Sequence, residues 1–366
     1  MSSAVPARVR ALSFHSRYRC CDSGACCSSG WDIPVEGGRS RVAAHDSTRR
    51  TADGRLVLRH DAAGRCVFLE GPPGSTRCAV HRQLGPEALP SACRQFPRVT
   101  LLTPLGVSVT LSHYCPTAAA LLFEAPERPT RIVEDAPAFP PDWPYEGLDA
   151  RSALPPLLRP GVLMSWAAHD RWETHVVATL TGSRAPGQAL ARLAAEAETA
   201  RRWAPPDGGF DRWFDAVLDA SDLREAPLPV VADLEAWDLV AATVPEGNPR
   251  PPRPGVAAGA EAVPAGWAAL RRPIGRWLAS KAFASWLALQ GDGLRTTVLG
   301  LQVALAVLRA EAVGACLRAG RPLDAALLEG AVRRSDLLLL HLADPSTLAA
   351  RLGRCERTEQ PATRPA

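Results

Sequence analysis

The sequence lacks the short cysteine knuckle that most thiolate sites use. No two cysteines are separated by two residues (C-x2-C) anywhere in the 366 residues. Zinc ribbons, zinc fingers and thioredoxin-like redox pairs depend on that knuckle, and the common ferredoxin runs use it as well. The cysteine spacing therefore argues against all of these classes.

Long uncharged apolar runs are also missing. The first twenty residues are interrupted by Pro6, Arg8 and His15, which is unlike the apolar core of a secretory signal. The most apolar stretch, residues 298–317, is broken by Gln, Arg and Glu, whereas a membrane span needs about 18 apolar residues with few or no charges. We expect a cytoplasmic protein without a membrane partner.

Lysine is almost absent, and the positive charge is dispersed. Lys281 is the only lysine among 42 basic residues, a bias that we attribute to genome composition. The formal net charge is +4, and the arginines alternate with Asp and Glu along the helical stretches instead of forming a stripe. We therefore expect no nucleic-acid partner.

What the sequence does contain is a concentration of cysteine in its first third. Eight of the ten cysteines lie between Tyr18 and Pro116. Thiols gathered in this way, in a chain without an export signal, are typical metal ligands, because a reducing compartment keeps them free. The candidate ligands are Cys20, Cys21, Cys26, Cys27, Cys66, Cys78, Cys93 and Cys115.

Other interpretations of the cysteines stay open. Free cysteine often behaves as a small buried hydrophobe, which is our interpretation of Cys316 in an apolar helix, and Cys355 receives no role. A disulfide framework would need an export route. Structural zinc and iron–sulfur clusters usually take four protein ligands, so eight cysteines could serve one site with spares or two sites.

Local patterns predict where the later cysteines lie. Two apolar runs within residues 55–70 flank a turn and predict a hairpin that carries Cys66. A short helix beginning at Pro86 and running through Arg94 carries Cys93. A second hairpin turns at residues 104–106, and Cys115 then stands at the start of a small helix, where backbone amides favour a thiolate.

Histidines are weaker candidates for ligands. His81 and His113 are near cysteines in the sequence and could substitute as ligands, although a hydrogen-bonded imidazole is the simpler interpretation of each. His341 lies on an apolar helix and is expected to be a hydrogen-bonded core residue.

The rest of the chain predicts a mainly α protein. Apolar residues recur every three or four positions through the second half, with a break expected at Pro273. We predict a small cysteine-rich α+β N-terminal domain with short hairpins, followed by a helical bundle. The predicted boundaries are 1–124 for the metal-binding domain, 125–160 for a Pro-rich linker, 161–352 for the helical domain and 353–366 for a flexible tail.

Several motifs together resemble the family of zinc- or iron-chelating cysteine-cluster proteins, in particular its flagellin lysine-N-methylase branch. The motifs are YRCCDSGACCSSGWDIPV, GRCVFLEGPPGSTRCAVHRQLGPEALPSACRQFPR and SHYCPTAAALL. The helical second half, including SKAFASWLALQGDGLRTTVLGLQVALAVLRA, is also similar to that branch. The resemblance covers most of the chain and is most specific in the cysteine motifs.

The resemblance implies a ligand set and an activity. The matching ligands are Cys20, Cys26, Cys27, Cys66, Cys78, Cys93 and Cys115, with Cys21 as an eighth, because the segment 20–27 is shorter here than in the branch. Arg94, Pro97 and Arg98 match a C-R-x-x-P-R string and would support the site. The activity implied is transfer of a methyl group from S-adenosylmethionine to lysine of a protein substrate such as flagellin.

Two functional hypotheses follow from these observations. The minimal one is a protein that binds zinc or an iron–sulfur cluster through cysteine thiolates, and whose helical half serves a partner. The sharper one is an S-adenosylmethionine-dependent protein lysine N-methyltransferase. The sequence shows no strand followed by G-x-G-x-x-G at a helix start, so no pocket for the methyl donor is predicted, and no catalytic residue can be named.

Overall fold

The fold is mainly α, as the sequence predicts. The computed structural model is about 52% helical and has small sheets. It describes residues 8–21, 23–36, 45–51, 54–72, 76–124, 129–134, 145–220, 232–246, 248–255 and 266–358. The predicted flexible tail lies outside these ranges, apart from residues 353–358.

The largest sheet has five strands in the order β8-β1-β7-β6-β9. The predicted hairpin around residues 104–106 is confirmed, because β6 and β7 pair antiparallel from Arg98–Leu111 to Thr103–Gly106. β1 runs parallel to β7. The strands are β1 (Val9–Leu12), β6 (Arg98–Thr103), β7 (Gly106–Leu111), β8 (Ile132–Glu134) and β9 (Leu148–Asp149).

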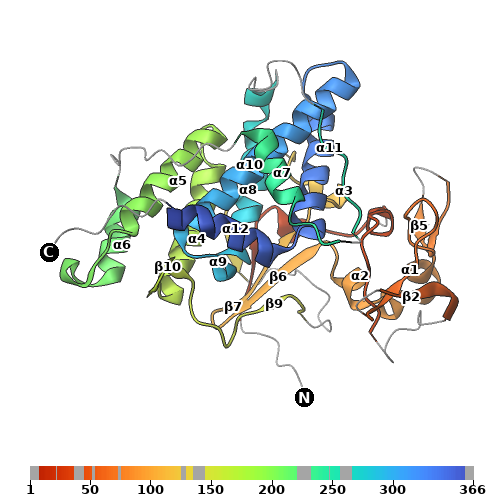
Figure 1. Cartoon of the computed structure of the whole chain (residues 1–366), viewed down its shortest axis with the longest axis horizontal. Helices are drawn as coiled ribbons and strands as arrows, with labels where there is room; N and C mark the ends of the chain where they lie inside the picture. Colours follow the sequence, from red (N-terminus) through yellow and green to blue (C-terminus); the bar gives the residue numbers. More distant parts are fainter. Residues whose placement is uncertain are drawn as a thin grey trace.

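Short elements surround the first seven cysteines. They are the 3₁₀ turn η2 (Ala25–Cys27), β2 (Thr48–Arg50), β3 (Leu56–Leu58), β4 (Leu69–Glu70), β5 (Arg77–Cys78), α1 (Ala79–Leu84), the 3₁₀ turn η4 (Pro86–Ala88) and α2 (Ser91–Gln95). In Figure 1 β2, β5, α1 and α2 lie to one side of the helical part.

The hairpin predicted to carry Cys66 is present as a short antiparallel contact around the turn at residues 61–64, through the bridge His60–Cys66 and the hydrogen bonds from the Asp61 amide to the Arg65 carbonyl and from the Val67 amide to the Arg59 carbonyl, while β3 also pairs with β2. One prediction in this region was wrong in detail. The predicted helix from Pro86 to Arg94 is split into η4 and α2. The cause is Pro90, since a residue before proline avoids helical angles, and Leu89 is extended.

The second half forms the predicted helices α4 to α11 and one further helix, α12, that the sequence patterns did not predict. They are α4 (Trp166–Thr181), α5 (Pro186–Ala200), α6 (Phe210–Asp219), α7 (Asp233–Ala241), α8 (Arg271–Ala282), α9 (Leu287–Gln290), α10 (Leu294–Ala319), α11 (Ala325–Asp336) and α12 (Pro345–Thr358). Before them come α3 (Pro116–Ala120) and the small hairpin β10 (Leu157–Arg159) with β11 (Val162–Leu163).

The break expected at Pro273 is wrong. Pro273 lies in the first turn of α8, where an amide hydrogen has no partner in the helix, so proline costs little there. The chain breaks instead after Ala282, and Ala284 has a positive φ of 57°.

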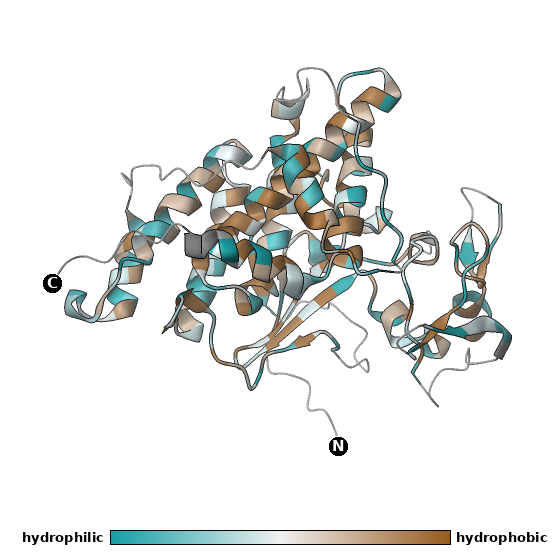
Figure 2. Ribbon diagram, in the orientation of Figure 1, coloured by the Kyte–Doolittle hydropathy of each residue, from teal (hydrophilic) through white to brown (hydrophobic). Residues whose placement is uncertain are grey.

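The helix α10 is the centre of the helical part. It contacts α5, α7, α11 and α12, and in Figure 2 the central helices are rich in hydrophobic residues. Its length and apolar composition would also suit a membrane span, but 78% of its most apolar window is buried inside the protein. This burial is typical of a core helix.

Among the described residues of the first 124, the buried apolar side chains fall into three clusters, of which one is a small group on the sheet: Val9, Leu102, Val107 and Val109. Leu12, Leu101 and Cys115 belong to the largest core, together with Trp172 and Trp277 of the helices. A separate small core contains Cys27, Cys66 and Val80, with Ile33 and Leu58. The sheet therefore packs with the helical part, while the cysteine-bearing turns have a core of their own. The predicted domain boundaries stay predictions.

From the lowered pKa values of His169 and His341 we expect the folded protein to lose stability in acid. Burial lowers the pKa of each to about 4, so both stay neutral in the folded protein while the unfolded chain takes up protons near pH 6.5. Their contribution to stability is present above pH 6.5 and is lost as the pH falls toward 4. We expect urea titrations at pH 7 and pH 5 to differ by up to about 2 kcal/mol per histidine.

The variants H169Q and H341Q test whether these two histidines cause the loss of stability in acid. Each should reduce the difference in unfolding free energy between pH 7 and pH 5, because glutamine does not titrate. An unchanged pH dependence in both variants would contradict it.

Candidate functional site

The cysteines of the small core are held by turns that the local sequence dictates. Gly24 precedes η2 with a φ of 67°, and a Cβ there would come within 2.8 Å of Thr76 Oγ1, so glycine is needed. The amide of Cys66 donates to the carbonyl of Cys27 over 2.7 Å. Cys78 pairs with Leu69 across β4 and β5 and is the residue before α1. Three separate segments thus bring their thiols together.

The thiol of Cys27 is the meeting point of this group. The thiols of Cys26, Cys66 and Cys78 all lie near it and shift its pKa. The sulfur atoms of Cys26 and Cys27 are 3.9 Å apart. We call Cys26, Cys27, Cys66 and Cys78 the thiol group.

The four thiols of the group influence one another's ionisation, and Cys27 is the member that keeps its proton. Its neighbours Cys26, Cys66 and Cys78, reinforced by burial, raise the pKa of Cys27. The neighbouring Cys27 thiol lowers the pKa of Cys78 to about 6, assisted by the backbone amides of His81 and Val80 at the start of α1. It also lowers the pKa of Cys26 and of Cys66. The arrangement therefore favours negatively charged sulfur, the form that binds metals.

Cys93 borders the thiol group from α2. Burial raises the pKa of its thiol, and the charges of Cys26, Cys66 and Cys78 raise it further. Cys93 packs against the same small core and lines the same cavity, which makes it a candidate for a fifth sulfur beside the four.

Cys20 and Cys115 stand apart with Tyr18. The Tyr18 hydroxyl is 3.7 Å from the sulfur of Cys115, and the guanidinium of Arg98 lies 5.4 Å from the centre of the Tyr18 ring. Burial raises the pKa of Tyr18, and the charges of Cys115 and Cys20 add to this effect. Cys115 immediately precedes α3, as the sequence predicts.

Both sets of cysteines face one cavity of about 390 Å³. Six candidate ligands line it, and Cys66 lies behind them, 3% exposed and bonded to Cys27. Cys21 is exposed, and its thiol points to the carbonyl of Arg19 at 3.6 Å. The six lining residues are Cys20, Cys26, Cys27, Cys78, Cys93 and Cys115.

The side chains that line the cavity do not converge on one position. Within the described ranges, no three Cys, His, Asp or Glu side chains are already arranged to hold a metal ion. Cys26, Cys27 and Cys78 line the cavity, while Cys66 lies behind them. Binding of an inorganic centre would require these side chains to move.

The two histidines considered as ligands differ in position. His81 lines the same cavity, one turn into α1. His113 is fully buried elsewhere and binds Asp336. His341 accepts or donates a hydrogen bond of 2.6 Å with Ser112, which confirms the expected bonded core imidazole.

A buried polar network escaped the sequence analysis. The carboxylate of Asp336 is completely buried and receives hydrogen bonds from the indole of Trp277 at 2.8 Å and from the amide of His113 at 2.6 Å. The ammonium of Lys281 is 2.7 Å away, and the His113 ring extends the network to His15 at 3.1 Å.

This network joins distant parts of the chain. Despite burial, the ammonium of Lys281 and the hydrogen bond from His113 keep the pKa of Asp336 well below its usual range. Burial lowers the pKa of Lys281. The only available signal was Lys281 itself, a single lysine in an apolar helix, which we attributed to composition. Its partner is 55 residues away in sequence and could not be found by pattern.

Comparison with known proteins gives no relative. No family model matches the chain, and neither the curated proteins nor the solved structures give a match. The family resemblance of the cysteine motifs therefore stays a prediction, and the geometry of the site carries the functional argument.

The Asp336–Lys281 pair gives a prediction for stability. The variant D336N should destabilise the protein by about 3–5 kcal/mol, because it leaves the ammonium of Lys281 buried without its charge partner. Denaturant titration of D336N, K281M and D336N/K281M measures the coupling free energy between the two side chains. The double variant should cost less than the sum of the two single changes.

The matched control is the exposed pair Asp149–Arg151. The variant D149N should change stability little, since an exposed ion pair is screened by water. Additive effects of D336N and K281M would contradict the interpretation of a coupled buried pair.

Proposed function

We propose that this protein binds an inorganic centre, an iron–sulfur cluster or zinc, through cysteine thiolates that face the 390 Å³ cavity. The observation that carries the proposal is the grouping of Cys26, Cys66 and Cys78 with Cys27 in one small core, with the sulfur atoms of Cys26 and Cys27 3.9 Å apart. These residues come from three segments up to 52 positions apart.

The donor set suits a soft metal. Four sulfur ligands are the usual set for structural zinc and for iron–sulfur clusters. The positive guanidinium of Arg98 and the amides at the start of α1 lie at the same cavity and offset negative charge on a thiolate-bound centre. The residues present therefore fit the group.

The grouping favours one site with spare cysteines over two sites. Five sulfurs lie together, those of the thiol group and Cys93, while Cys20 and Cys115 form only a pair beside Tyr18. A pair cannot complete a second four-ligand site. Cys20 and Cys115 would supply at most an additional ligand on the far side of the cavity, and Cys21 none.

Two observations bear on the identity of the metal. A zinc–sulfur distance of about 2.3 Å implies about 3.8 Å between sulfurs of a tetrahedron, close to the 3.9 Å between Cys26 and Cys27. The cavity, however, is much larger than a single ion needs and suits a polynuclear cluster. The proposal therefore includes both zinc and an iron–sulfur cluster.

We also propose that the cysteine-bearing turns form a small α+β unit that the metal stabilises. Its core contains few large apolar side chains, and its helices α1 and α2 have only six and five residues. Elements this short gain little stability from packing alone, so a bound metal would supply it.

Metal analysis after anaerobic purification tests the proposal. We expect about one centre per chain, with broad visible absorption and matching iron and sulfide for a cluster, or colourless protein with zinc. C27S should lose most of the metal, because Cys27 is grouped with the three other thiols in one small core. C66S and C78S should behave similarly.

Two cysteines outside the cavity serve as controls. C21S and C316S should retain the metal, since Cys21 is exposed and Cys316 lies on α10. A metal-free wild-type protein under anaerobic conditions would contradict the proposal, as would undiminished metal in all three thiol-group variants.

Methyl transfer from S-adenosylmethionine to a flagellin-like protein is the alternative function. It rests on the resemblance of the cysteine motifs and on a second cavity, of about 340 Å³, that shares Arg98 with the first. Calorimetric titration with S-adenosylmethionine tests it. Binding at micromolar concentration would support the enzyme, whereas neither heat nor a thermal shift at millimolar concentration would argue strongly against it.

A further inference from the structure

The ring of His341 is surrounded by three aromatic side chains. Trp31 stacks on it, with 4.2 Å between the ring centres and 19° between the ring planes. The rings of Phe96 and Tyr114 lie 5.8 Å and 6.2 Å from it. Trp31 also lies 5.6 Å from Phe96 and 5.4 Å from Tyr114, so the four rings form one packed unit. We call Trp31, Phe96, Tyr114 and His341 the aromatic cluster.

Each of the three rings around His341 is close in sequence to a candidate metal ligand. The intervals are four, three and one positions, and all three of these cysteines line the 390 Å³ cavity. The pairs are Cys27 with Trp31, Cys93 with Phe96, and Cys115 with Tyr114. Three segments that are distant in the chain thus bring a thiol to the cavity and a ring to the same imidazole.

Trp31 joins the cysteine-bearing turns to the helical part. Its side chain packs against the small core that contains Cys27 and also against the core formed by α7, α10 and α12. The chain between Cys27 and Trp31 is short and is tied back to η2, because the hydroxyl of Ser29 donates to the carbonyl of Cys26 over 3.1 Å. The position of Trp31 therefore depends on the position of η2.

Tyr114 and His341 are held by the helical part instead. The guanidinium of Arg333 on α11 donates a hydrogen bond of 3.1 Å to the carbonyl of Tyr114 and lies 5.7 Å from the centre of its ring. The ring of His341 bonds to the hydroxyl of Ser112 over 2.6 Å. Trp31 is thus the ring that the cysteine-bearing turns place against a site fixed by the helices.

His341 belongs to an irregular segment of helix. It lies in the π-helix η7 (Leu337–Leu342), which directly follows α11. The amide of Ala343 reaches back five residues to the carbonyl of Leu338, over 2.9 Å. Helical segments of this kind are rare and are frequent at functional sites. We regard η7 as the part of the helical scaffold that is most easily changed by a neighbour.

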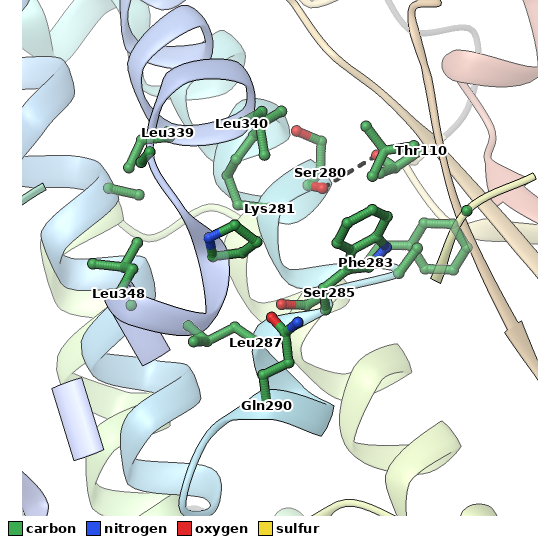
Figure 3. Close-up of a pocket in the computed structure, with 18 of the residues that line it drawn as sticks. Thr110, Ser280, Lys281, Phe283, Ser285, Leu287, Gln290, Leu339, Leu340 and Leu348 are labelled. Carbon is green, nitrogen blue, oxygen red and sulfur yellow. Dashed lines mark hydrogen bonds between the residues drawn. The ribbon is translucent and has the colours of Figure 1, made fainter. Parts of the chain in front are cut away.

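η7 also forms one wall of the second cavity. Figure 3 shows Leu339 and Leu340 on this side of the open space, with Phe283 on another side. Phe96 lines the first cavity and His341 lines the second. The aromatic cluster therefore connects the cysteine-lined cavity with this wall through packed side chains, which is a physical route for coupling between two sites.

We propose that loading of the thiolate site is transmitted through the aromatic cluster to η7, so that the metal-loaded and metal-free proteins differ in the local stability of this segment. The inference rests on the proposed metal binding. The side chains of the thiol group must move to hold a centre, and Trp31 moves with η2. A fixed η2 holds Trp31 against His341 and stabilises η7, whereas a loose η2 weakens this contact.

Amide hydrogen exchange measured by mass spectrometry tests this coupling. We expect the amides of residues 337–342 to exchange about tenfold more slowly in the metal-loaded protein than in protein stripped with a chelator, a factor typical of coupling between two sites. Exchange in α5 is the internal control and should be the same in both forms. Equal exchange of residues 337–342 in the two forms would overturn the proposal.

Metal content is measured on the same samples, which separates the two proposals. Wild-type protein that holds no metal after anaerobic purification would overturn both of them. Metal-loaded protein whose η7 exchanges as fast as in the stripped form would overturn the coupling alone and leave the metal proposal standing.

The variants W31L and W166L form a matched pair. Both remove an indole next to a histidine, since the ring of Trp166 lies 6.4 Å from that of His169 on α4. W31L should keep the metal and reduce the tenfold difference to less than about twofold, because the stacked ring is lost. W166L should keep both the metal and the difference. An undiminished difference in W31L, or its loss in W166L, would refute the role of Trp31.

A second variant covers the case in which W31L does not fold or does not hold the metal. H341Q then decides the question, because glutamine can still bond to Ser112 but does not provide a ring for Trp31 to stack on. We expect the difference in exchange to fall below about twofold in H341Q as well. A tenfold difference that persists in H341Q would contradict the proposal.

Discussion

The buried carboxylate of Asp336 is the interaction on which the arrangement of the helical part depends. It joins α11 to α8 through Lys281 and Trp277, and to the segment after β7 through His113. A charge in this position is tolerated only because a cation and several donors surround it. The sheet and the helices are thereby fixed relative to each other, and both cavities lie beside elements that this network holds.

The thiol group is built on a different principle. Its members are positioned by a glycine turn, a two-strand ladder and single backbone hydrogen bonds, with only a small apolar core beneath them. Such a site has short-range order but little stability of its own. The contrast with the α10-centred core explains how one chain can combine a rigid helical scaffold with a site that a bound centre would complete.

Residue patterns predicted the helices from α4 to α11 and the hairpin of β6 and β7, because each depends on neighbours within a few positions. They also identified the cysteines that meet at Cys27. They did not reveal that Cys21 is exposed, that β3 pairs with β2, or that Asp336 and Lys281 bind each other. These outcomes depend on contacts between distant segments, which local periodicity cannot encode. Pro273 was misjudged because its position within the first turn of α8 decides its effect.

The position of Lys281 has a practical consequence. It is the only lysine, its side chain is 8% exposed, and its ammonium is engaged by Asp336. The folded chain thus offers no accessible side-chain amine to acylating reagents, amine-directed cross-linkers or lysine-modifying enzymes. Labelling of Lys281 would report opening of the structure.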